Sequence, residues 1–310
     1  MKVLLAGGTG FVGRSLVRHL VREGHECIVL VRKNYVGQER YFPTGTVLTP
    51  FNVRPDEIDA VINLAGEPVA GSWSEAHKKR IMDSRVDTTR DLVQWIATLK
   101  NPPKVFLSAS AIGFYGDGGD EELTETSRLD PKRSFLAQVC ILWEQEANVA
   151  KKLGIRVVNL RLGNVIHANG GFLFGLAPML RFAPVYSPIA PKAFLSWISM
   201  RDTVRLIEFA LKNDEVQGPM NVVSPNPTTN REFYKILGKV KGRPVLGAMP
   251  SAILRKIVGP FSEAILASQR VVPAKALDHG FQFEDTDIAK LLSEQLSKKR
   301  QGGKDKNSGK

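Results

Sequence analysis

The chain has 310 residues, of which 43% are hydrophobic, and its formal net charge is +12. This length suits one large α/β domain with a smaller region beside it, and no apolar run approaches the ~20 residues of a membrane span. Because an apolar run begins at residue 1 and only Cys27 and Cys140 supply thiols, we expect a cytoplasmic protein with free buried cysteines, no leader peptide and no metal site.

The end of the chain is basic. Residues 298–310 contain six Lys or Arg and one Asp, a net charge of +5, which leaves +7 on the remainder. A segment of Gly, Lys, Asn and Ser cannot bury apolar surface, so we expect it to be disordered. We interpret this tail as an aid to solubility rather than a nucleic-acid or membrane contact, and the remaining +7 as suited to an anionic ligand such as a phosphorylated cofactor.

The first turn reads Gly7-Gly8-Thr9-Gly10-Phe11-Val12-Gly13 and joins an apolar run, 1–6, to an amphipathic run, 11–23. This pattern predicts a strand, a glycine-rich turn and a helix. Gly7 permits the tight turn, Gly10 lets a pyrophosphate approach the backbone, and Gly13 lets the helix pack close to the strand. The free N–H groups and the dipole of the helix then favour phosphate, although the alternative is a tight turn that binds nothing.

The residues after the second strand, 27–31, bear on the choice of cofactor. NAD-binding proteins tend to place Asp or Glu about 20 residues past the glycine turn, where it accepts a hydrogen bond from the ribose 2′-OH. Here Arg32 and Lys33 stand 19 and 20 residues past Gly13. Because Arg can bind a 2′-phosphate that a carboxylate would repel, the sequence favours NADP(H), the alternative being a solvated loop.

The next strand covers residues 59–66 and follows a shorter one at 46–49. Its end carries Leu64, Ala65 and Gly66, and the small residues in this turn let the chain pass close to the adenosine side of a cofactor. A long helix is predicted over 74–99. It carries Arg80 and Arg85, either of which could face the cofactor, although a solvated arginine is the usual case.

A buried strand over 104–107 ends in the polar stretch Ser108-Ala109-Ser110-Ala111-Ile112-Gly113-Phe114-Tyr115-Gly116. Ligands of open parallel sheets lie at the carboxyl ends of strands, so this stretch is a candidate polar site. We predict an acidic loop over 117–130, which serves as a lid or simply as surface. The later elements are expected as a helix over 135–153, a strand over 155–160, a strand over 194–198, a helix over 201–212, a strand over 220–223, a helix over 228–241 capped by Thr229 or Asn230, and small helices over 250–296.

These motifs together resemble the extended short-chain dehydrogenase/reductases of the NAD(P)-dependent epimerase/dehydratase superfamily. The runs that carry the resemblance are Gly7-x-x-Gly10-x-x-Gly13, Asn63-Leu64-Ala65-Gly66-Glu67-Pro68, residues 83–90, 108–116 and 135–140, Arg161-Leu162-Gly163-Asn164 and Ser196-Trp197-Ile198. They resemble most closely an atypical branch whose members carry only the name epimerase family protein and end in a small domain of unknown function. The resemblance covers nearly all of the chain except the basic tail.

The resemblance implies a Rossmann-like doubly wound parallel sheet with a smaller mixed α/β C-terminal substrate region. We divide the chain into a dinucleotide-binding domain over 1–168, an interleaved substrate lobe over 169–249, a small helical domain over 250–296 and the tail over 297–310. Helix pairing into homodimers is frequent in such relatives, so a homodimer is an expectation as well.

The resemblance also assigns site residues. The cofactor contacts that we expect from the motifs and the resemblance together are Gly7, Thr9, Gly10, Phe11, Val12, Gly13, Arg32, Lys33, Leu64, Ala65, Gly66, Arg85, Leu162 and Asn164. In the wider family a Ser polarises the substrate and a Tyr-x-x-x-Lys dyad exchanges the proton. Ser110 matches that Ser, and Tyr115 is the nearest substitute for the missing Tyr, unless it only forms a wall of the cleft.

The dyad itself is missing. Aligning Glu144 with a downstream Glu of the family places Leu136 and Cys140 at the dyad positions, and a shift by one places Phe135 and Val139 there. None of these four replaces the tyrosine and lysine. We therefore expect an NADP(H)-dependent oxidoreductase or epimerase that acts on an unidentified carbonyl or sugar-nucleotide-like substrate without the usual dyad. The alternatives are a non-catalytic NADPH-binding sensor or assembly partner and, less favoured, nucleic-acid binding through the tail.

Overall fold

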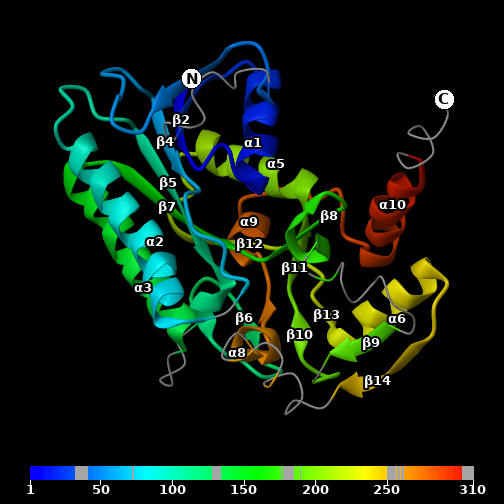
Figure 1. Ribbon diagram of the computed structural model, residues 1–310. Helices are drawn as coiled ribbons and strands as arrows, with labels where there is room; N and C mark the ends of the chain where they lie inside the picture. The colour runs from blue at the N-terminus through cyan, green and yellow to red at the C-terminus, as the bar shows by residue number, and fades with distance from the viewer. Residues whose placement is uncertain are drawn as a thin grey trace.

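The computed structural model describes residues 1–31, 41–71, 73–127, 134–174, 176, 185–188, 190–249, 256, 259 and 262–301. At its centre lies a seven-stranded sheet in which every neighbouring pair of strands is parallel (Figure 1). In sheet order the strands are β12 (Gly218–Val222), β7 (Arg156–Leu162), β5 (Val105–Ala111), β4 (Ala60–Asn63), β1 (Lys2–Ala6), β2 (Glu26–Val31) and β3 (Thr46–Pro50). The direction of chain winding reverses between β1 and β4, which confirms the Rossmann-like fold and puts the turn after β1 at the switch point where ligands bind.

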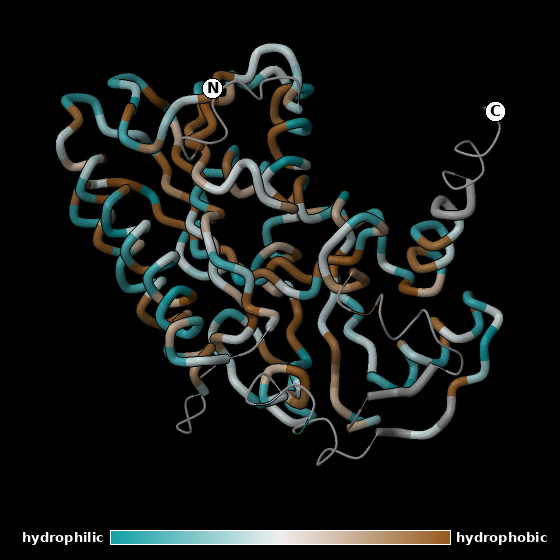
Figure 2. Tube along the Cα trace, in the orientation of Figure 1, coloured by the Kyte–Doolittle hydropathy of each residue, from teal (hydrophilic) through white to brown (hydrophobic). Residues whose placement is uncertain are grey.

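Helices cover both faces of this sheet, and strand alternation decides which side chains meet which helices. Val3 and Leu5 of β1 join the core beneath one helical layer, whereas Leu4 and Ala6 join the core beneath the other. The hydropathy colouring shows largely apolar strands at the centre and helices in which polar and apolar residues alternate (Figure 2). The two layers are α1 (Phe11–Arg22) with α5 (Met200–Lys212), and α2 (Glu75–Ile96) with α3 (Phe135–Asn148).

Four helices begin at side-chain caps that the sequence encodes locally. Ser74, Ser134 and Ser199 accept hydrogen bonds from backbone N–H groups in the first turns of α2, α3 and α5. Thr229 and Glu232 form a reciprocal capping box at α6 (Asn230–Lys241), so Thr229 is the cap of the two candidates. The helix predicted over 135–153 ends earlier, at Asn148, and a 3-10 turn η4 (Val149–Leu153) completes it.

Beyond the central sheet, short strands pair over long sequence separations. The pairs are β8 (Asn164–His167) with β11 (Trp197–Ser199), β10 (Phe194–Leu195) with β13 (Thr228–Thr229), β9 (Val185–Pro188) with β14 (Val245–Met249), and β6 (Glu122–Leu123) with β15 (Arg270–Val271). The single strand predicted over 194–198 is therefore wrong. It divides at Ser196, whose buried Oγ donates to the carbonyl oxygen of Gln269 at 2.7 Å and accepts from the N–H of Val271 at 2.9 Å.

The C-terminal helices lie against different parts of the molecule. They are α8 (Ser262–Leu266), α9 (Ala274–Asp278) and α10 (Ile288–Gln301), and α9 packs on β12 whereas α10 packs on α6 (Figure 1). Among the described residues, no helix combines the length and the apolar character that crossing a membrane requires. The prediction of a disordered tail over 297–310 is wrong for residues 297–301, which continue α10, and from residue 302 onward the tail lies outside the described residues.

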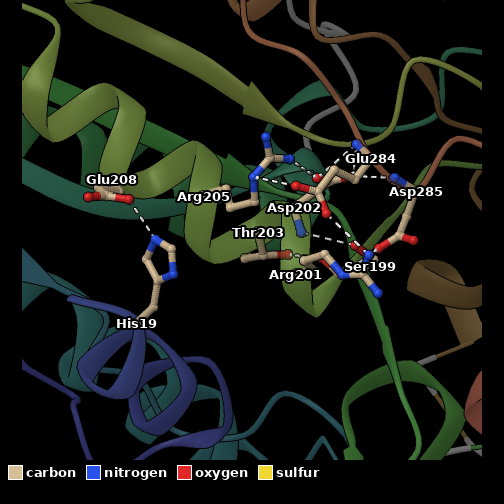
Figure 3. A network of polar contacts seen from close by, with 9 residues as sticks. All are labelled: His19, Ser199, Arg201, Asp202, Thr203, Arg205, Glu208, Glu284 and Asp285. Carbon is tan, nitrogen blue, oxygen red and sulfur yellow. Dashed lines mark hydrogen bonds and ion pairs between the residues drawn. The ribbon is translucent and has the colours of Figure 1, made fainter. Parts of the chain in front are cut away.

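A buried carboxylate fixes the segment between α9 and α10 (Figure 3). Asp202, at the start of α5, is fully buried and accepts hydrogen bonds from the backbone N–H groups of Glu284 at 3.1 Å and Asp285 at 2.8 Å. Arg205 donates to the same carboxylate at 2.6 Å. Because these donors compensate the buried charge, the C-terminal segment is held firmly against the central domain.

Candidate functional site

The glycine turn after β1 is interlocked with the turn after β4. Gly7 has φ of +78°, and a Cβ there would lie 2.4 Å from the backbone carbon of Leu64. A Cβ at Gly13 would lie 2.2 Å from the carbonyl oxygen of Gly7, so the tight turn and the close helix packing predicted for Gly7 and Gly13 are confirmed. Gly8 is an additional packing glycine, because its Cβ would meet Val29 Cγ1 at 2.6 Å.

Gly10 differs from these glycines. A Cβ on Gly10 would meet only the carbonyl oxygen of Gly7, at 3.2 Å, and Gly10 is exposed. It is the N-cap of α1, makes no side-chain capping hydrogen bond, and no acidic residue lies in the first turn. Within the part of the chain that the structure describes, the first N–H groups of α1 thus have no carboxylate or hydroxyl acceptor from a side chain and suit a phosphate, the geometry that the cofactor interpretation requires. Thr9, Phe11 and Val12 are partly exposed at this turn.

Asn63 shapes the neighbouring turn at the end of β4. Its fully buried amide donates to Thr89 Oγ1 at 2.8 Å, and its Oδ1 accepts from the N–H of Ala65 at 3.1 Å. These bonds hold the turn whose residues Leu64 and Ala65 lie against Gly7, while Gly66 lies against the guanidinium of Arg85. We missed this role of Asn63, although an amide that ends an apolar strand is a signal of it.

Arg85 of α2 faces the same turn. Its Nη1 donates to the carbonyl oxygens of Glu67 at 3.0 Å and Ile81 at 3.1 Å, and its guanidinium carbon lies 5.2 Å from the ring centre of Trp143. Burial lowers the pKa of Arg85 below its ordinary value. Among the described residues, no carboxylate forms an ion pair with it, which leaves its charge available to an anion beside Gly66.

The surroundings of the other predicted cofactor residues give weaker support for a contact with a cofactor. Arg80 is more than half exposed, with Nε 3.7 Å from Glu67 Oε1. Asn164 donates from its side chain to the carbonyl oxygen of Ser196 at 2.9 Å, and Leu162 is partly exposed at the end of β7. Arg32 and Lys33 lie outside the described residues.

Ser110 at the end of β5 is committed to a buried ion pair. It is 1% exposed, and its Oγ donates to Glu144 Oε1 at 2.8 Å. Glu144 in turn accepts from Arg161 Nε at 2.8 Å and Nη2 at 3.0 Å, a bidentate pair inside the protein. Because its proton points to Glu144, this arrangement argues against the predicted role of Ser110 in polarising a substrate.

Tyr115 belongs to the same network. It lies in the 3-10 turn η3 (Ile112–Tyr115), is 2% exposed, and donates to Asn221 Oδ1 at 2.7 Å while accepting from Arg161 Nη1 at 2.9 Å. Burial raises its pKa. A buried hydroxyl with both partners satisfied is neither a wall of the cleft nor an accessible proton donor, so both expectations for Tyr115 lose their geometric support.

The helix that would carry the dyad packs on η3 through apolar groups. A Cβ on Gly113 would lie 3.5 Å from Leu136 Cβ and 3.9 Å from Cys140 Sγ. Burial raises the pKa of Cys140 to about 11, so the thiol stays protonated at neutral pH. Sequence analysis missed Arg161, Glu144 and Asn221 as members of the buried network, although charged residues inside an otherwise apolar strand and helix are a signal for such a pair.

A surface groove lies away from this site. It has a volume of about 1170 Å³ and runs between α1, α5 and residues 280–284, with His19 and Glu208 in its lining. These two side chains are 2.6 Å apart (Figure 3). Within the described ranges, no group of three or more metal-ligating side chains gathers here or elsewhere. The polar and steric features that suit a nucleotide phosphate converge instead at the glycine turn.

Comparison with known proteins agrees with this geometry. The sequence matches the NAD dependent epimerase/dehydratase family over residues 3–223 and a domain of unknown function, DUF1731, over residues 249–295. It is 33% identical over 303 residues to Epimerase family protein YfhF of Bacillus subtilis, covering 97% of this chain and 99% of that protein.

Solved structures extend the comparison. The crystal structure of human epimerase family protein SDR39U1 with NADPH aligns with a TM-score of 0.84 at 28% identity, covering 96% of this chain and 99% of that chain. The Thermus thermophilus UDP-glucose 4-epimerase complex with NAD, at 21% identity and a TM-score of 0.72 over 96% of this chain and 99% of that one, shares the fold. The chain therefore belongs to the NAD-dependent epimerase/dehydratase family of short-chain dehydrogenase/reductase-like proteins, with a C-terminal DUF1731 domain.

Proposed function

We propose that this protein binds NADP(H) and acts as an oxidoreductase or epimerase on a carbonyl or sugar-nucleotide-like substrate, without a Tyr-x-x-x-Lys dyad. The observation that carries the proposal is the interlocked turn of Gly7, Gly10 and Gly13, which leaves the start of α1 without a side-chain cap and leaves space above Gly10. This cradle fits a dinucleotide pyrophosphate. NADPH, when bound, supplies a hydride, and the chain supplies its orientation and the charge of Arg85.

The preference for NADP(H) is supported by Arg32 and Lys33 in the sequence and by the NADPH in the structure of the human relative. A 2′-phosphate contact from Arg contributes about 1.5–3 kcal/mol, or roughly 10–100-fold in affinity. We expect Arg32→Glu to weaken NADPH binding by that factor and to leave NADH binding within about threefold of wild type. Equal losses for both nucleotides would contradict the assignment.

The chemistry that fits the site is one in which neither Ser110 nor Tyr115 exchanges a proton with the substrate. Both hydroxyls are committed to the network of Glu144, Arg161 and Asn221. Removing either partner of the buried pair would leave an uncompensated charge, at a cost of about 3–5 kcal/mol. The network therefore supports a structural role for the residues at these two positions.

The test is a label-transfer experiment. The protein is loaded with NADPH tritiated at the nicotinamide C4 and mixed with a metabolite extract, and tritium is then sought outside the nucleotide. Label in a new compound establishes a reductase and identifies its substrate class. To detect an epimerase, which returns its hydride to the cofactor, sugar nucleotides are incubated with the loaded protein in parallel and their stereoisomers are separated. If neither assay yields a product, the proposed activity is refuted.

A second function is favoured by the same buried network. The hydroxyls of Ser110 and Tyr115 have their hydrogen-bond partners inside the protein. The proposed nucleotide site at the glycine turn therefore lacks the usual proton carriers, an arrangement suited to a non-catalytic NADPH sensor. A sensor must bind a partner differently with and without NADPH. Pull-downs from a lysate with and without NADPH test this function, and identical partner sets would exclude it.

A further inference from the structure

A hairpin that contains two glycines extends from the end of β8 and lies against the N-terminal end of α1, where a phosphate would bind. Backbone bridges join Ile166 to Gly171 and His167 to Gly170, and Gly171 has φ of +62°. A Cβ at Gly171 would lie 2.4 Å from the carbonyl oxygen of Val165. The hairpin therefore depends on glycine at this position.

The hairpin encloses the ring of Phe11, the first residue of α1. A Cβ on Gly170 would lie 2.4 Å from Phe11 Cδ2 and Cε2, and one on Gly171 would lie 2.6 Å from Cε1. On another side, the ring of His167 is tilted by 56° with its centre 5.8 Å away. The Phe11 ring thus packs against the bare backbone of the hairpin, and Phe11 belongs to the first turn of α1, next to the glycine turn.

The hairpin is held from outside by the last helix. Gln295 of α10 accepts a hydrogen bond through Oε1 from the N–H of Ala168, at the turn of the hairpin, at 3.0 Å. Leu291, Leu292 and Leu296 of α10 share an apolar core with Ile166 at the base of the hairpin. This helix lies largely within the matched domain of unknown function, residues 249–295.

We propose that α10 is a positioning element for the nucleotide, so that this C-terminal domain serves to hold the hairpin 166–171 on Phe11. Gln295 acts through the hairpin and does not touch the nucleotide. When the hairpin loosens, Phe11 gains freedom, the start of α1 loses order and the nucleotide dissociates faster. This inference rests on the proposed binding of NADP(H) at the glycine turn.

The test compares three variants by stopped-flow displacement of NADPH with excess NADP⁺. Gln295→Met keeps the shape of the side chain but removes the acceptor, and we expect the NADPH dissociation rate to rise about 2–10-fold. Gln295→Glu keeps an acceptor and should restore a rate near that of wild type. The matched control is Asn226→Leu, because Asn226 Nδ2 donates to the carbonyl oxygen of Thr286 at 3.0 Å and so ties the same C-terminal segment through a hydrogen bond that does not involve Gln295 or Ala168.

One more variant tests the contact between the hairpin and Phe11 directly. Gly170→Ala drives a methyl group into the Phe11 ring without touching α10, and it should also accelerate dissociation. Because both changes act through the hairpin, the double variant with Gln295→Met should show less than the sum of the two effects in logarithmic rate.

The outcomes are distinct. Equal rates for wild type and Gln295→Met, or the same acceleration in Asn226→Leu, refute the positioning role. Full additivity in the double variant refutes the shared route through the hairpin. If the wild-type protein does not bind NADPH at all, the proposed function fails, and that result is distinguishable from a wild type that binds while Gln295→Met behaves identically.

Discussion

Gly10 and Gly13 lie three residues apart in one motif, yet the structure gives them different tasks. A methyl group on Gly13 would lie 2.2 Å from the carbonyl oxygen of Gly7 and 2.7 Å from Gly8 Cα, whereas one on Gly10 would meet only the carbonyl oxygen of Gly7, at 3.2 Å. Gly10 has φ of −74°, which alanine adopts without strain. We therefore predict that Gly13→Ala damages the fold and that Gly10→Ala damages nucleotide binding.

The magnitudes follow from these contacts. In an unobstructed helix, alanine at position 13 would add about 1 kcal/mol of stability relative to glycine. Here the obstructing atoms are backbone and cannot rotate away, so the overpacking cost is set at the upper end of its range, about 3 kcal/mol. The net loss for Gly13→Ala is about 2 kcal/mol, or about 4 °C in Tm. Gly10→Ala should change stability by less than about 0.5 kcal/mol while weakening NADPH binding about 10–100-fold, because the added methyl displaces the pyrophosphate.

The assays are urea unfolding of the apoprotein and titration with NADPH by its fluorescence. Gly247→Ala provides the control, since a Cβ there would meet nothing within 4 Å. Gly13→Ala with wild-type stability, or Gly10→Ala with wild-type NADPH affinity, would show that the division of tasks between packing and ligand approach is wrong.

Three further predictions concern buried groups. Ser110→Ala and Tyr115→Phe should each reduce the free energy of unfolding by about 1–3 kcal/mol and leave NADPH affinity and label transfer unchanged; loss of transfer at unchanged stability would restore their catalytic roles. Burial lowers the pKa of His25 from 6.5, so the folded protein takes up a proton less readily than the unfolded chain, and stability falls as the pH drops below about 6.5. A His25→Gln variant should lose less Tm than wild type between about pH 7.5 and 5.5, and parallel curves would contradict this. Burial raises the pKa of both Cys27 and Cys140 to about 11, so iodoacetamide at neutral pH should label neither in the native protein and both after unfolding, as read by intact mass; rapid native labelling would contradict the burial of these thiols.

Much of the central domain could be read from local patterns. The glycine turn, the apolar strands and the Thr229 cap each depend on a few adjacent residues, because strand alternation, helix capping and tight turns are short-range requirements. The resemblance predicted that the ends of β4 and β5 form the cofactor side, and the structure brings Leu64 and Ala65 to the glycine turn.

The roles of Ser110 and Tyr115 could not be read in this way. Their positions at the end of β5 were correctly predicted, but the direction of each hydroxyl depends on partners far along the chain. Glu144 lies 34 residues from Ser110, and Asn221 lies 106 residues from Tyr115. No local pattern encodes which of several polar groups a buried hydroxyl will meet.

The sequence by itself determined that a strand, a glycine turn and a helix would follow one another, because the contact that requires glycine at position 13, with the carbonyl oxygen of Gly7, lies within this short stretch. Only the tertiary structure decided that the expected catalytic hydroxyls would be enclosed around Arg161 and that Gln295 would reach the hairpin over Phe11. A buried charge must be compensated by whichever groups the fold brings to it, and a helix that ends the chain contacts whatever surface the rest of the core leaves open.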